Sequence, residues 1–361
     1  METKPSEISR KGASSLLKTG GGFSKGKHSV LYRATLVFLA AALFLGVRGQ
    51  DRMLVEVPRI MNFRGNNSMD KNQDANMPKF LVFNKKTEYC QEETLNEMKT
   101  ISLFLGLIGD TFVSRDLRER LTANLWVWND REIENISHSD YRNLNNFLVV
   151  LGGDGALLET CYKFQGYIPV IYSFNFGTLG GIVPFSASEA VGVFLGVEGD
   201  PKKEYRTRME VEITRGEQWR EDAGAVVCRT VMNEVLVRRD AEKSVMKFGV
   251  KIGGKEAGKY AGDGFMVSTP TGSTGYSKSL NGPEIKQDSE CFLLSLMCSM
   301  DRKASSIIFS DSEEIEISLL PENRCESCHI DFDGRERMAF YKGDVVVVRK
   351  SPHSVCMAVK G

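Results

Sequence analysis

Residues 147–155 read Phe-Leu-Val-Val-Leu-Gly-Gly-Asp-Gly, an apolar run that ends in a glycine-rich turn. An unbroken apolar run of strand length is typical of a strand buried in a parallel sheet. Glycines let the backbone approach a phosphate closely, and the N-terminus of a following helix favours an anion. We therefore expect a strand over 146–151, a helix over 155–164, and an anion-binding turn between them at the carboxyl edge of the sheet.

Asp154 is an unusual residue for such a turn, because a carboxylate repels phosphate. It makes chemical sense if it takes a proton from an attacking hydroxyl or holds a metal ion. The alternative is a tight turn in which the aspartate only caps the helix. The tetrapeptide by itself leaves both interpretations open.

The segments before and after this junction alternate between strand-like and helix-like patterns. Short apolar runs at 79–84 and 168–172 are typical of buried strands, and the stretch near 91–107 is helical in pattern. Alternation at this spacing predicts a parallel sheet with helices between its strands. We place this α/β N-terminal domain at 79–200.

The pattern changes after about Pro201. Alternating or apolar runs of strand length, separated by glycine-rich turns, predict a β-rich C-terminal domain at 201–361. The expected strands are 208–214, 225–238, 246–252, 264–268, 306–309, 315–320, 329–332 and 345–349.

A second strand-to-loop junction lies in this β-rich half. Residues 264–277 read Gly-Phe-Met-Val-Ser-Thr-Pro-Thr-Gly-Ser-Thr-Gly-Tyr-Ser, an apolar strand followed by a loop of hydroxyls and glycines. Backbone amides and hydroxyls in such a loop suit a ligand that bears phosphate or ribose. Two such loops, far apart in the chain, predict an active site in the interdomain cleft.

The first 50 residues differ in composition from the rest. They hold eight Lys and Arg against two Glu, and residues 34–47 carry no charge. This leader resembles a signal peptide, a membrane anchor or an organellar transit peptide, and the alternative is an untargeted extension of a cytoplasmic protein. Membrane association through it is one expectation. Residues 51–78 are rich in Asn, Asp and Met and are expected to be a linker.

Charge and cysteine content restrict the partners and the compartment. The formal net charge is zero, and beyond the leader no basic stripe is evident, so nucleic-acid binding is not expected. The eight cysteines are scattered through a chain long enough to fold without disulfides, which favours a reducing compartment.

Four motifs, in this order, resemble those of the NAD kinase family. They are Gly152-Gly-Asp-Gly155, Met232-Asn-Glu-Val-Leu-Val237, Asp263-Gly-Phe-Met-Val-Ser-Thr-Pro-Thr-Gly-Ser-Thr-Gly-Tyr276 and Asp331-Phe-Asp-Gly-Arg335. The first motif alone is shared with diacylglycerol kinases, sphingosine kinases and phosphofructokinases. The resemblance covers roughly residues 79–350.

The resemblance implies an ATP-dependent phosphorylation of the adenosine-ribose 2′-hydroxyl of NAD, which gives NADP. Asp154 would activate that hydroxyl toward the γ-phosphate of ATP, and Mg²⁺ would bridge the ATP phosphates without any implied metal ligand from the chain. The implied binding residues are Gly152, Gly153 and Gly155 around the phosphates, Asn233 and Glu234 at the ribose and adenine, and Asp263, Thr271, Thr274, Gly275 and Tyr276 along the dinucleotide pocket. A homo-oligomer, dimer or tetramer, is also implied.

The chain departs from the family pattern in three places. Ala156 stands where the family usually has Thr or Ser, Gly181 replaces an aromatic residue, and residues 298–300 are Cys-Ser-Met where Cys-Pro-His is usual. These departures leave two other interpretations open. One is a non-catalytic NAD-binding homologue, and the more distant one is a lipid kinase of the diacylglycerol or sphingosine type.

Overall fold

A computed structural model describes residues 78–361, apart from 122–124, 132, 135–145, 178–179, 198, 217–223, 241–243, 301–305 and 325. The leader at 1–50 and the linker at 51–77 lie outside the described residues. Within the described residues, no helix is both long and apolar enough to cross a membrane.

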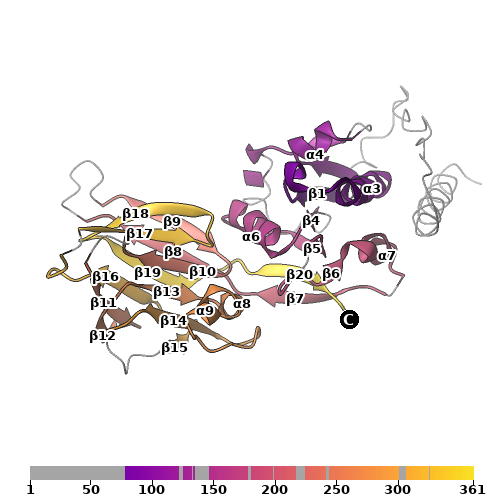
Figure 1. The fold of residues 1–361 in the computed structure, drawn as a ribbon. Coiled ribbons are helices and arrows are strands. Elements are labelled where there is room, and N and C mark those ends of the chain that lie inside the picture. The colour runs from indigo at the N-terminus through magenta and orange to yellow at the C-terminus, as the bar shows by residue number, and fades with distance from the viewer. Residues whose placement is uncertain are drawn as a thin grey trace, which may run out of the picture. The chain divides into compact units, whose positions relative to one another are not determined.

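The first sheet is mostly parallel, and its strand order is β3-β2-β1-β4-β5-β20-β7, with β6 paired to β5 (Figure 1). Its strands are β1 (Lys79–Asn84), β2 (Asp110–Val113), β3 (Trp126–Val127), β4 (Asn146–Leu151), β5 (Val170–Asn175), β6 (Phe185–Ser186), β7 (Lys202–Arg206) and β20 (Val355–Val359). The strand order reverses direction between β1 and β4, which are paired in parallel. Open α/β sheets bind ligands outside the carboxyl ends of strands at such a switch point.

Helices connect the parallel strands, as the alternating pattern predicts. The longer ones are α3 (Glu92–Ile108), α4 (Arg115–Glu119), α6 (Asp154–Lys163) and α7 (Ala190–Leu195). The expected strands at 79–84 and 146–151 and the expected helices near 91–107 and 155–164 are confirmed to within a residue or so. β5 begins two residues later than expected and runs on to Asn175.

The second half of the chain forms two antiparallel sheets. One has the order β15-β14-β13-β10-β17-β18 and the other the order β12-β11-β16-β19-β8-β9. The strands are β8 (Met209–Thr214), β9 (Val226–Val231), β10 (Glu234–Arg238), β11 (Met246–Ile252), β12 (Lys255–Gly262), β13 (Gly264–Ser268), β14 (Cys291–Met297), β15 (Ile307–Ser310), β16 (Ile315–Leu319), β17 (Ser327–Phe332), β18 (Glu336–Tyr341) and β19 (Val345–Lys350). One buried cluster takes side chains from both sheets, including Val211 and Phe265, so the sheets pack face to face.

The expected fold class, an α/β domain followed by a β-rich domain, is confirmed. The expected boundary at residue 200, however, does not coincide with a boundary between sheets. β7 and β20 both lie after that residue, yet they pair with each other and β20 pairs with β5 in the first sheet (Figure 1). The chain therefore leaves the first sheet after β7 and returns to it after β19.

Arg208 lies where the chain makes these two crossings, and it is almost fully buried. Its guanidinium donates to the carbonyl oxygens of His353 and Phe164, each at 2.7 Å, and to that of Gly166. Burial lowers the pKa of Arg208 to about 10, although Cys161 and Asp333 act in the opposite direction. One buried side chain thus connects the segment after α6 to the segment before β20.

The expected strand at 225–238 is in fact two strands, and this break creates part of the site. β9 pairs with β8 in one antiparallel sheet, and β10 pairs with β13 and β17 in the other. Met232 and Asn233 form the turn between them.

Candidate active site

The Gly-Gly-Asp-Gly turn links the end of β4 to the start of α6. Gly152 leaves no room for a side chain, since an added Cβ would lie 2.5 Å from the Cβ of Ala156. Gly153 is the N-cap of α6, and Asp154 is its first residue. The structure therefore places the Asp154 carboxylate at a helix N-terminus, at the carboxyl edge of the parallel sheet.

The Asp154 carboxylate is held in place by backbone amides of a neighbouring loop. Its Oδ2 accepts from the amide of Gly181 at 2.8 Å, and its Oδ1 accepts from Ile182 and Val183, each at 3.1 Å. A carboxylate has about four lone pairs that can accept hydrogen bonds, two on each oxygen. Three of them are used here, so one lone pair on Oδ2 remains for a further donor. Asp154 is thus fixed in position and still able to accept one more hydrogen bond.

The turn between β9 and β10 carries Asn233 and Glu234. Asp333 accepts from the amides of Met232, Asn233 and Glu234 at 2.7, 2.8 and 2.9 Å, and its own amide donates to the Glu234 carbonyl. Thr269 bonds the other two carbonyls, donating from Oγ1 to Met232 at 2.6 Å and from its amide to Asn233 at 2.9 Å. Two residues therefore satisfy every backbone polar group of this turn.

The side chains of Asn233 and Glu234 are consequently not needed to support the turn. Asn233 Oδ1 and Glu234 Oε2 are buried and have no hydrogen-bond partner among the described residues. An unpaired buried oxygen costs about 1–3 kcal/mol, so these two atoms are expected to be satisfied by a bound ligand. Burial, followed by the charge of Asp333, raises the pKa of Glu234 to about 8. At neutral pH Glu234 therefore carries a proton and can donate as well as accept.

The protein is expected to lose thermal stability as the pH rises from 5 to 9 in the absence of ligand. Glu234 keeps its proton in the folded chain up to a pKa of about 8, above its ordinary value of 4.5. A group whose pKa is raised by folding contributes its full stabilisation at a pH below its pKa in the unfolded chain. That stabilisation is lost as the pH rises through its pKa in the folded chain. Melting curves should show a fall of roughly 5 °C, and Glu234→Gln should lack most of it. Identical pH slopes for the two proteins would contradict this assignment.

The loop from Thr269 to Tyr276 packs directly on the Asn233 turn. It contains two short helical turns, α8 (Pro270–Ser273) and α9 (Tyr276–Ser279). A Cβ on Gly272 would lie 2.2 Å from the backbone oxygen of Asn233. A Cβ on Gly275 would lie 3.6 Å from Asn233 Nδ2 and 4.0 Å from Glu234 Oε2, so Gly275 borders the unpartnered atoms.

Gly272 and Gly192 make a matched pair of variants. Gly272→Ala is expected to push the Asn233 turn out of place and to weaken dinucleotide binding by tenfold or more, about 1.4 kcal/mol or above. Gly192 lies in α7, where an added Cβ would lie 3.9 Å from its nearest neighbour, the Cβ of Val197, so Gly192→Ala should bind within about threefold of the wild type, about 0.7 kcal/mol. Calorimetric titration with NAD measures both, and equal losses for the two variants would contradict the packing argument.

The other residues expected in this loop, Thr271, Thr274 and Tyr276, differ in their exposure to solvent and in their hydrogen bonds. Thr271 is buried, and its hydroxyl donates to Gln287 at 2.8 Å rather than to an open pocket. Thr274 is exposed and donates to the Thr271 carbonyl. Tyr276 is 43% exposed, so its ring is available to a base or sugar.

Asp263 does not lie with these residues in the folded chain. It precedes β13, whereas Thr269 follows it, and the five residues of β13 between them span about 16 Å. The Asp263 carboxylate is bonded to Arg239 at 2.7 Å. Within one chain, β13 therefore separates Asp263 from the loop that carries Thr271, Thr274, Gly275 and Tyr276. Cys298 also lies at this far end, since Met297 pairs with Gly264.

Several contacts bring the Gly-Gly-Asp-Gly turn and the Asn233 turn together. Met232 packs in one buried cluster with Leu157 and Cys161 of α6. Arg335 donates from Nη2 to the carbonyl of Gly155 at 2.7 Å, and it lies two residues after Asp333. The site therefore draws on both halves of the chain, as expected.

Thr269, Asp333 and Arg335 are the site residues that sequence reasoning did not single out. All three lie inside the motifs quoted above, and membership in those motifs is the feature of the sequence that could have identified them. Their role is to hold backbone groups in place, and a sequence pattern does not show which amide a distant carboxylate will bind.

The structure shows the contacts of two residues that depart from the family pattern, Ala156 and Gly181. Ala156 packs against Gly152, as described above. Gly181 donates its amide to Asp154, and a Cβ there would begin 3.6 Å from Asp154 Oδ2. Steric space therefore does not exclude a larger residue at 181.

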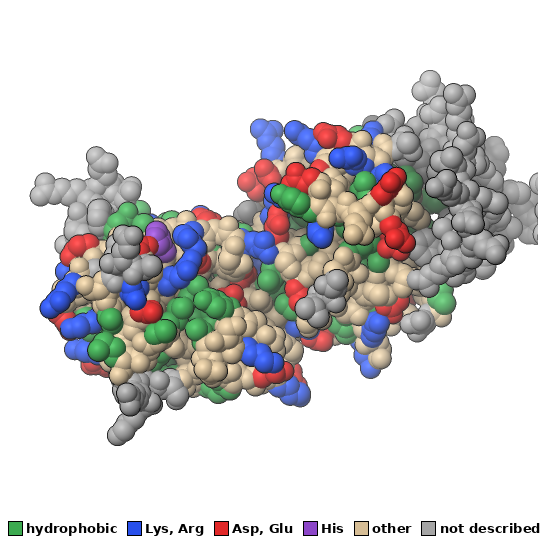
Figure 2. All heavy atoms as spheres, in the orientation of Figure 1, with side chains coloured by type: hydrophobic (Ala, Val, Ile, Leu, Met, Phe, Trp, Pro, Cys, Tyr) green, Lys and Arg blue, Asp and Glu red, His purple; other side chains and the backbone are tan. Residues whose placement is uncertain are grey.

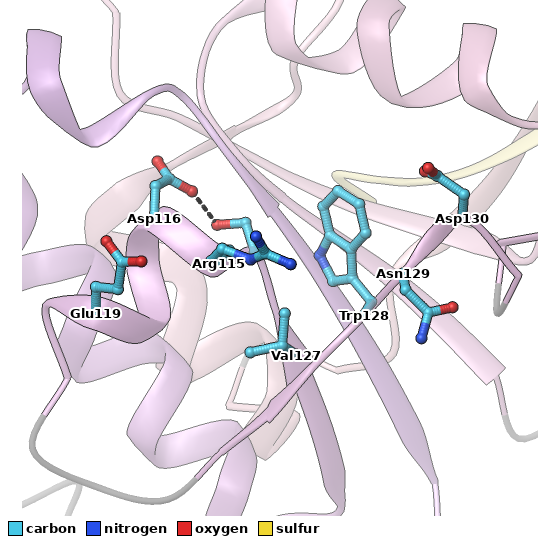
Figure 3. Close-up of a pocket in the computed structure, with 8 residues that line it drawn as sticks. Arg115, Asp116, Glu119, Val127, Trp128, Asn129 and Asp130 are labelled. Atoms are coloured by element: carbon cyan, nitrogen blue, oxygen red, sulfur yellow. Dashed lines mark hydrogen bonds between the residues drawn. The ribbon is translucent and has the colours of Figure 1, made fainter.

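Two hollows lie beside this site on the α/β domain. One, of about 490 Å³, is lined by Arg115, Asp116, Glu119 and Trp128 among others (Figure 3). A second, of about 470 Å³, shares Asp116 and Trp128 and reaches α6 at Ala156 and Lys163. Asp116 accepts from Ser114, from the amide of Thr87 and from the Asn84 side chain. Neither hollow contains Asn233 or Glu234.

The wider surface is mixed in charge. On the face drawn in Figure 2, Lys and Arg side chains are interspersed with Asp and Glu. Within the described part of the chain, no group of three or more His, Cys, Asp and Glu could hold a metal ion.

Comparisons with known proteins bear on the family and on the fold of this chain. Residues 232–359 match the model of the ATP-NAD kinase C-terminal domain. The NAD kinase of Gemmatimonas aurantiaca is 30% identical over 210 residues, which cover 58% of this chain and 70% of that protein. A yeast NADH kinase complexed with NADH has a similar fold, with a TM-score of 0.68, 20% identity, and coverage of 79% of this chain and 84% of that one. An NAD kinase from Archaeoglobus fulgidus in complex with ATP gives a TM-score of 0.55 at 20% identity, covering 78% of this chain and 93% of that one.

The Gly-Gly-Asp-Gly turn at the switch point of the parallel sheet places the chain in the class of Gly-Gly-Asp-Gly kinases. Within that class, the family model and the relatives narrow the assignment. The chain belongs to the NAD kinase family.

Proposed function

We propose that this protein is an ATP-dependent NAD kinase, which transfers the γ-phosphate of ATP to the adenosine-ribose 2′-hydroxyl of NAD. The observation that carries the proposal is the pairing of two groups. Asp154 is fixed by three amides with one acceptor position open, and the Asn233 turn beside α6 presents two buried, unpartnered oxygens. The first group suits a general base, and the second suits a ligand rich in hydroxyls and amines.

The roles of the residues follow from their positions. Asn233 and Glu234 bind the ribose and adenine part of NAD, with Tyr276 and Gly275 along its edge. Gly152, Gly153 and Gly155 leave the start of α6 open to the ATP phosphates. As the 2′-oxygen forms its bond to the γ-phosphorus, the bond to the β,γ-bridging oxygen breaks and ADP leaves. The proton of the 2′-hydroxyl passes to Asp154.

Magnesium belongs to this proposal as a companion of ATP. Bound Mg²⁺ would neutralise charge on the phosphates during transfer.

The direct test is formation of NADP from NAD, ATP and Mg²⁺ by the purified protein, followed with an NADP-specific dehydrogenase. Diacylglycerol and NADH are offered in parallel reactions, and an arm with EDTA removes the metal. NADP formation that EDTA abolishes supports the proposal. NAD binding by calorimetry without any turnover would favour the non-catalytic homologue, and phosphorylation of diacylglycerol instead of NAD would favour the lipid kinase. No comparison points to either of these alternatives.

We also propose a homo-oligomer, dimer or tetramer, and targeting by the leader to a membrane, the secretory path or an organelle. The first rests on family resemblance, and the second on the basic, uncharged-core composition of residues 1–50. Light scattering on the purified protein measures the oligomer. Microscopy of the chain tagged at its C-terminus, with and without residues 1–50, tests the leader.

A further inference from the structure

Helix α6 carries Asp154 at its first residue, and its opposite end is bonded to the β-rich part of the chain. Tyr162, in the last turn of α6, donates from its hydroxyl to Glu336 Oε2 at 2.5 Å. Arg229 of β9 grips the same carboxylate with two bonds of 2.8 Å, one to each oxygen. Just beyond the helix, the amide of Thr230 donates to Gln165 Oε1 at 2.7 Å.

Two segments contact α6 in this way, the end of β9 with Arg229 and residues 333–336. The same two segments also form and support the Asn233 turn. Arg229 lies four residues before Asn233 on the same stretch of chain. Glu336 lies three residues after Asp333, whose carboxylate holds the amides of that turn. Between them, Arg335 bonds the carbonyl of Gly155 next to Asp154. The segment 333–336 therefore bonds α6 at Gly155 and at Tyr162 and supports the Asn233 turn through Asp333, whereas Arg229 reaches α6 through Glu336.

We propose that the Tyr162–Glu336–Arg229 cluster is a positioning device, which sets the distance between Asp154 and the ribose hydroxyl held at Asn233 and Glu234. This inference rests on the proposed function. None of the three residues is placed in contact with a substrate. They act through α6, by keeping its N-terminal residue in register with the turn.

The character of the cluster suits positioning more than stability. The Arg229 and Glu336 side chains are 30% and 32% exposed, and ion pairs with that much solvent contact contribute little to stability. Their paired, planar bonds nevertheless fix geometry closely. A misplacement of about 1 Å in a reacting group can cost about a hundredfold in rate.

The protonation states of the cluster are also constant around neutral pH. Burial, together with the bond to Glu336, raises the pKa of Tyr162 well above its ordinary value, so the phenol remains a donor. The bond from Arg229 lowers the pKa of Glu336, and the pKa of Arg229 is raised by the same bond. The link should therefore hold the same geometry across the working pH range.

The experiment compares Tyr162→Phe and Glu336→Gln with the wild type in steady-state kinetics. Tyr162→Phe removes one hydroxyl and leaves the Arg229–Glu336 pair intact. Both variants are expected to lower kcat by about 10- to 100-fold and to leave the KM for NAD within about threefold, about 0.7 kcal/mol. Glu336→Asp, which keeps the charge, should recover part of the loss.

A matched control is available in Arg349 of β19, which binds Glu210 and Glu212 of the neighbouring strand β8 with similar exposure. Arg349→Gln should lower the Tm as much as the two variants do and leave kcat unchanged. If Tyr162→Phe and Glu336→Gln behave like Arg349→Gln, the cluster is only structural and the inference fails. A rise in KM alone would place its effect on the dinucleotide instead.

Hydrogen exchange gives a readout that needs no turnover. The amides of Gly181, Ile182 and Val183 are bonded to Asp154, so a displaced α6 should expose them. Their exchange is expected to accelerate about tenfold in Tyr162→Phe and not at all in Arg349→Gln. Unchanged exchange would overturn the positioning role even if the enzyme is active. A wild type that makes no NADP would instead refute the proposed function.

Discussion

Asp154→Asn should reduce kcat for NADP formation by about 10² to 10⁴-fold, the usual contribution of a positioned general base. Asparagine keeps the size of the side chain and can still accept the amides of Ile182 and Val183 through its carbonyl oxygen. It loses the proton acceptor and the bond from Gly181. The change therefore removes the base while the loop stays close to its place.

The binding of NAD tests whether this loss is catalytic. Its dissociation constant, measured by calorimetry, should stay within about threefold of the wild type, about 0.7 kcal/mol, because Asn233 and Glu234 are untouched. Glu316→Gln, which removes an exposed carboxylate paired with Lys251, should leave both quantities unchanged. A variant with Asp154→Asn that keeps more than a third of wild-type kcat would exclude Asp154 as the base.

The substitution Asp333→Asn is the second one with a large expected effect. It should weaken the binding of NAD and also lower the stability of the fold. The carboxylate accepts three amides at 2.7–2.9 Å, whereas an asparagine presents an NH₂ group to at least one of them. An unsatisfied buried group costs about 1–3 kcal/mol. We expect a Tm lower by roughly 3–10 °C and a KM for NAD raised by tenfold or more, about 1.4 kcal/mol. Asp333 has φ 47°, a left-handed conformation that asparagine tolerates, so backbone strain does not enter.

Asp344 supplies the control, because it is fully buried and also accepts two amides, from Gly216 and Tyr341, each at 3.0 Å. Asp344→Asn should destabilise the fold by a similar amount and leave the KM of the remaining folded protein unchanged. If both aspartate variants raise KM equally, the effect of Asp333 is one of general stability.

The first part of the fold could be predicted because local pattern determines it. The apolar run of β4, the glycines after it and the pattern of α6 specify strand, turn and helix without reference to the rest of the chain. The position of Asp154 at the helix N-terminus follows from the same residues. The amides of Gly181, Ile182 and Val183 that hold it could not be predicted, since they come from a loop with no distinct pattern.

The strand expected at 225–238 shows why other features could not be predicted. Its residues are apolar or alternating throughout, so nothing local interrupts them. The interruption comes from Asp333, about a hundred residues later, which takes the amides of residues 232–234. The turn that carries Asn233 and Glu234 therefore exists through a contact between distant segments. Asp263 shows that residues of one motif need not lie together, because the extended strand β13 separates it from Thr269 within one chain.

β7 and β20 were missed as members of the first sheet on similar grounds. β7 reads Lys-Lys-Glu-Tyr-Arg, which is too polar to predict a strand, and its position at the sheet edge makes that polarity acceptable. β20 is short, and its own sequence does not specify β5 as its partner.

The return of β20 to the first sheet has a consequence for how the protein is made. On a ribosome, β5 emerges long before β20, and all of the sandwich is synthesised between them. Until then this edge of β5 is unpaired except at Phe174 and Asn175, which pair with β6, and an unpaired edge is prone to pair with other chains. The α/β half therefore waits for β20, and both halves should become protease-resistant together. Contacts this distant in sequence also slow folding, so nascent chains should depend on chaperones more than chains whose domains close in sequence order.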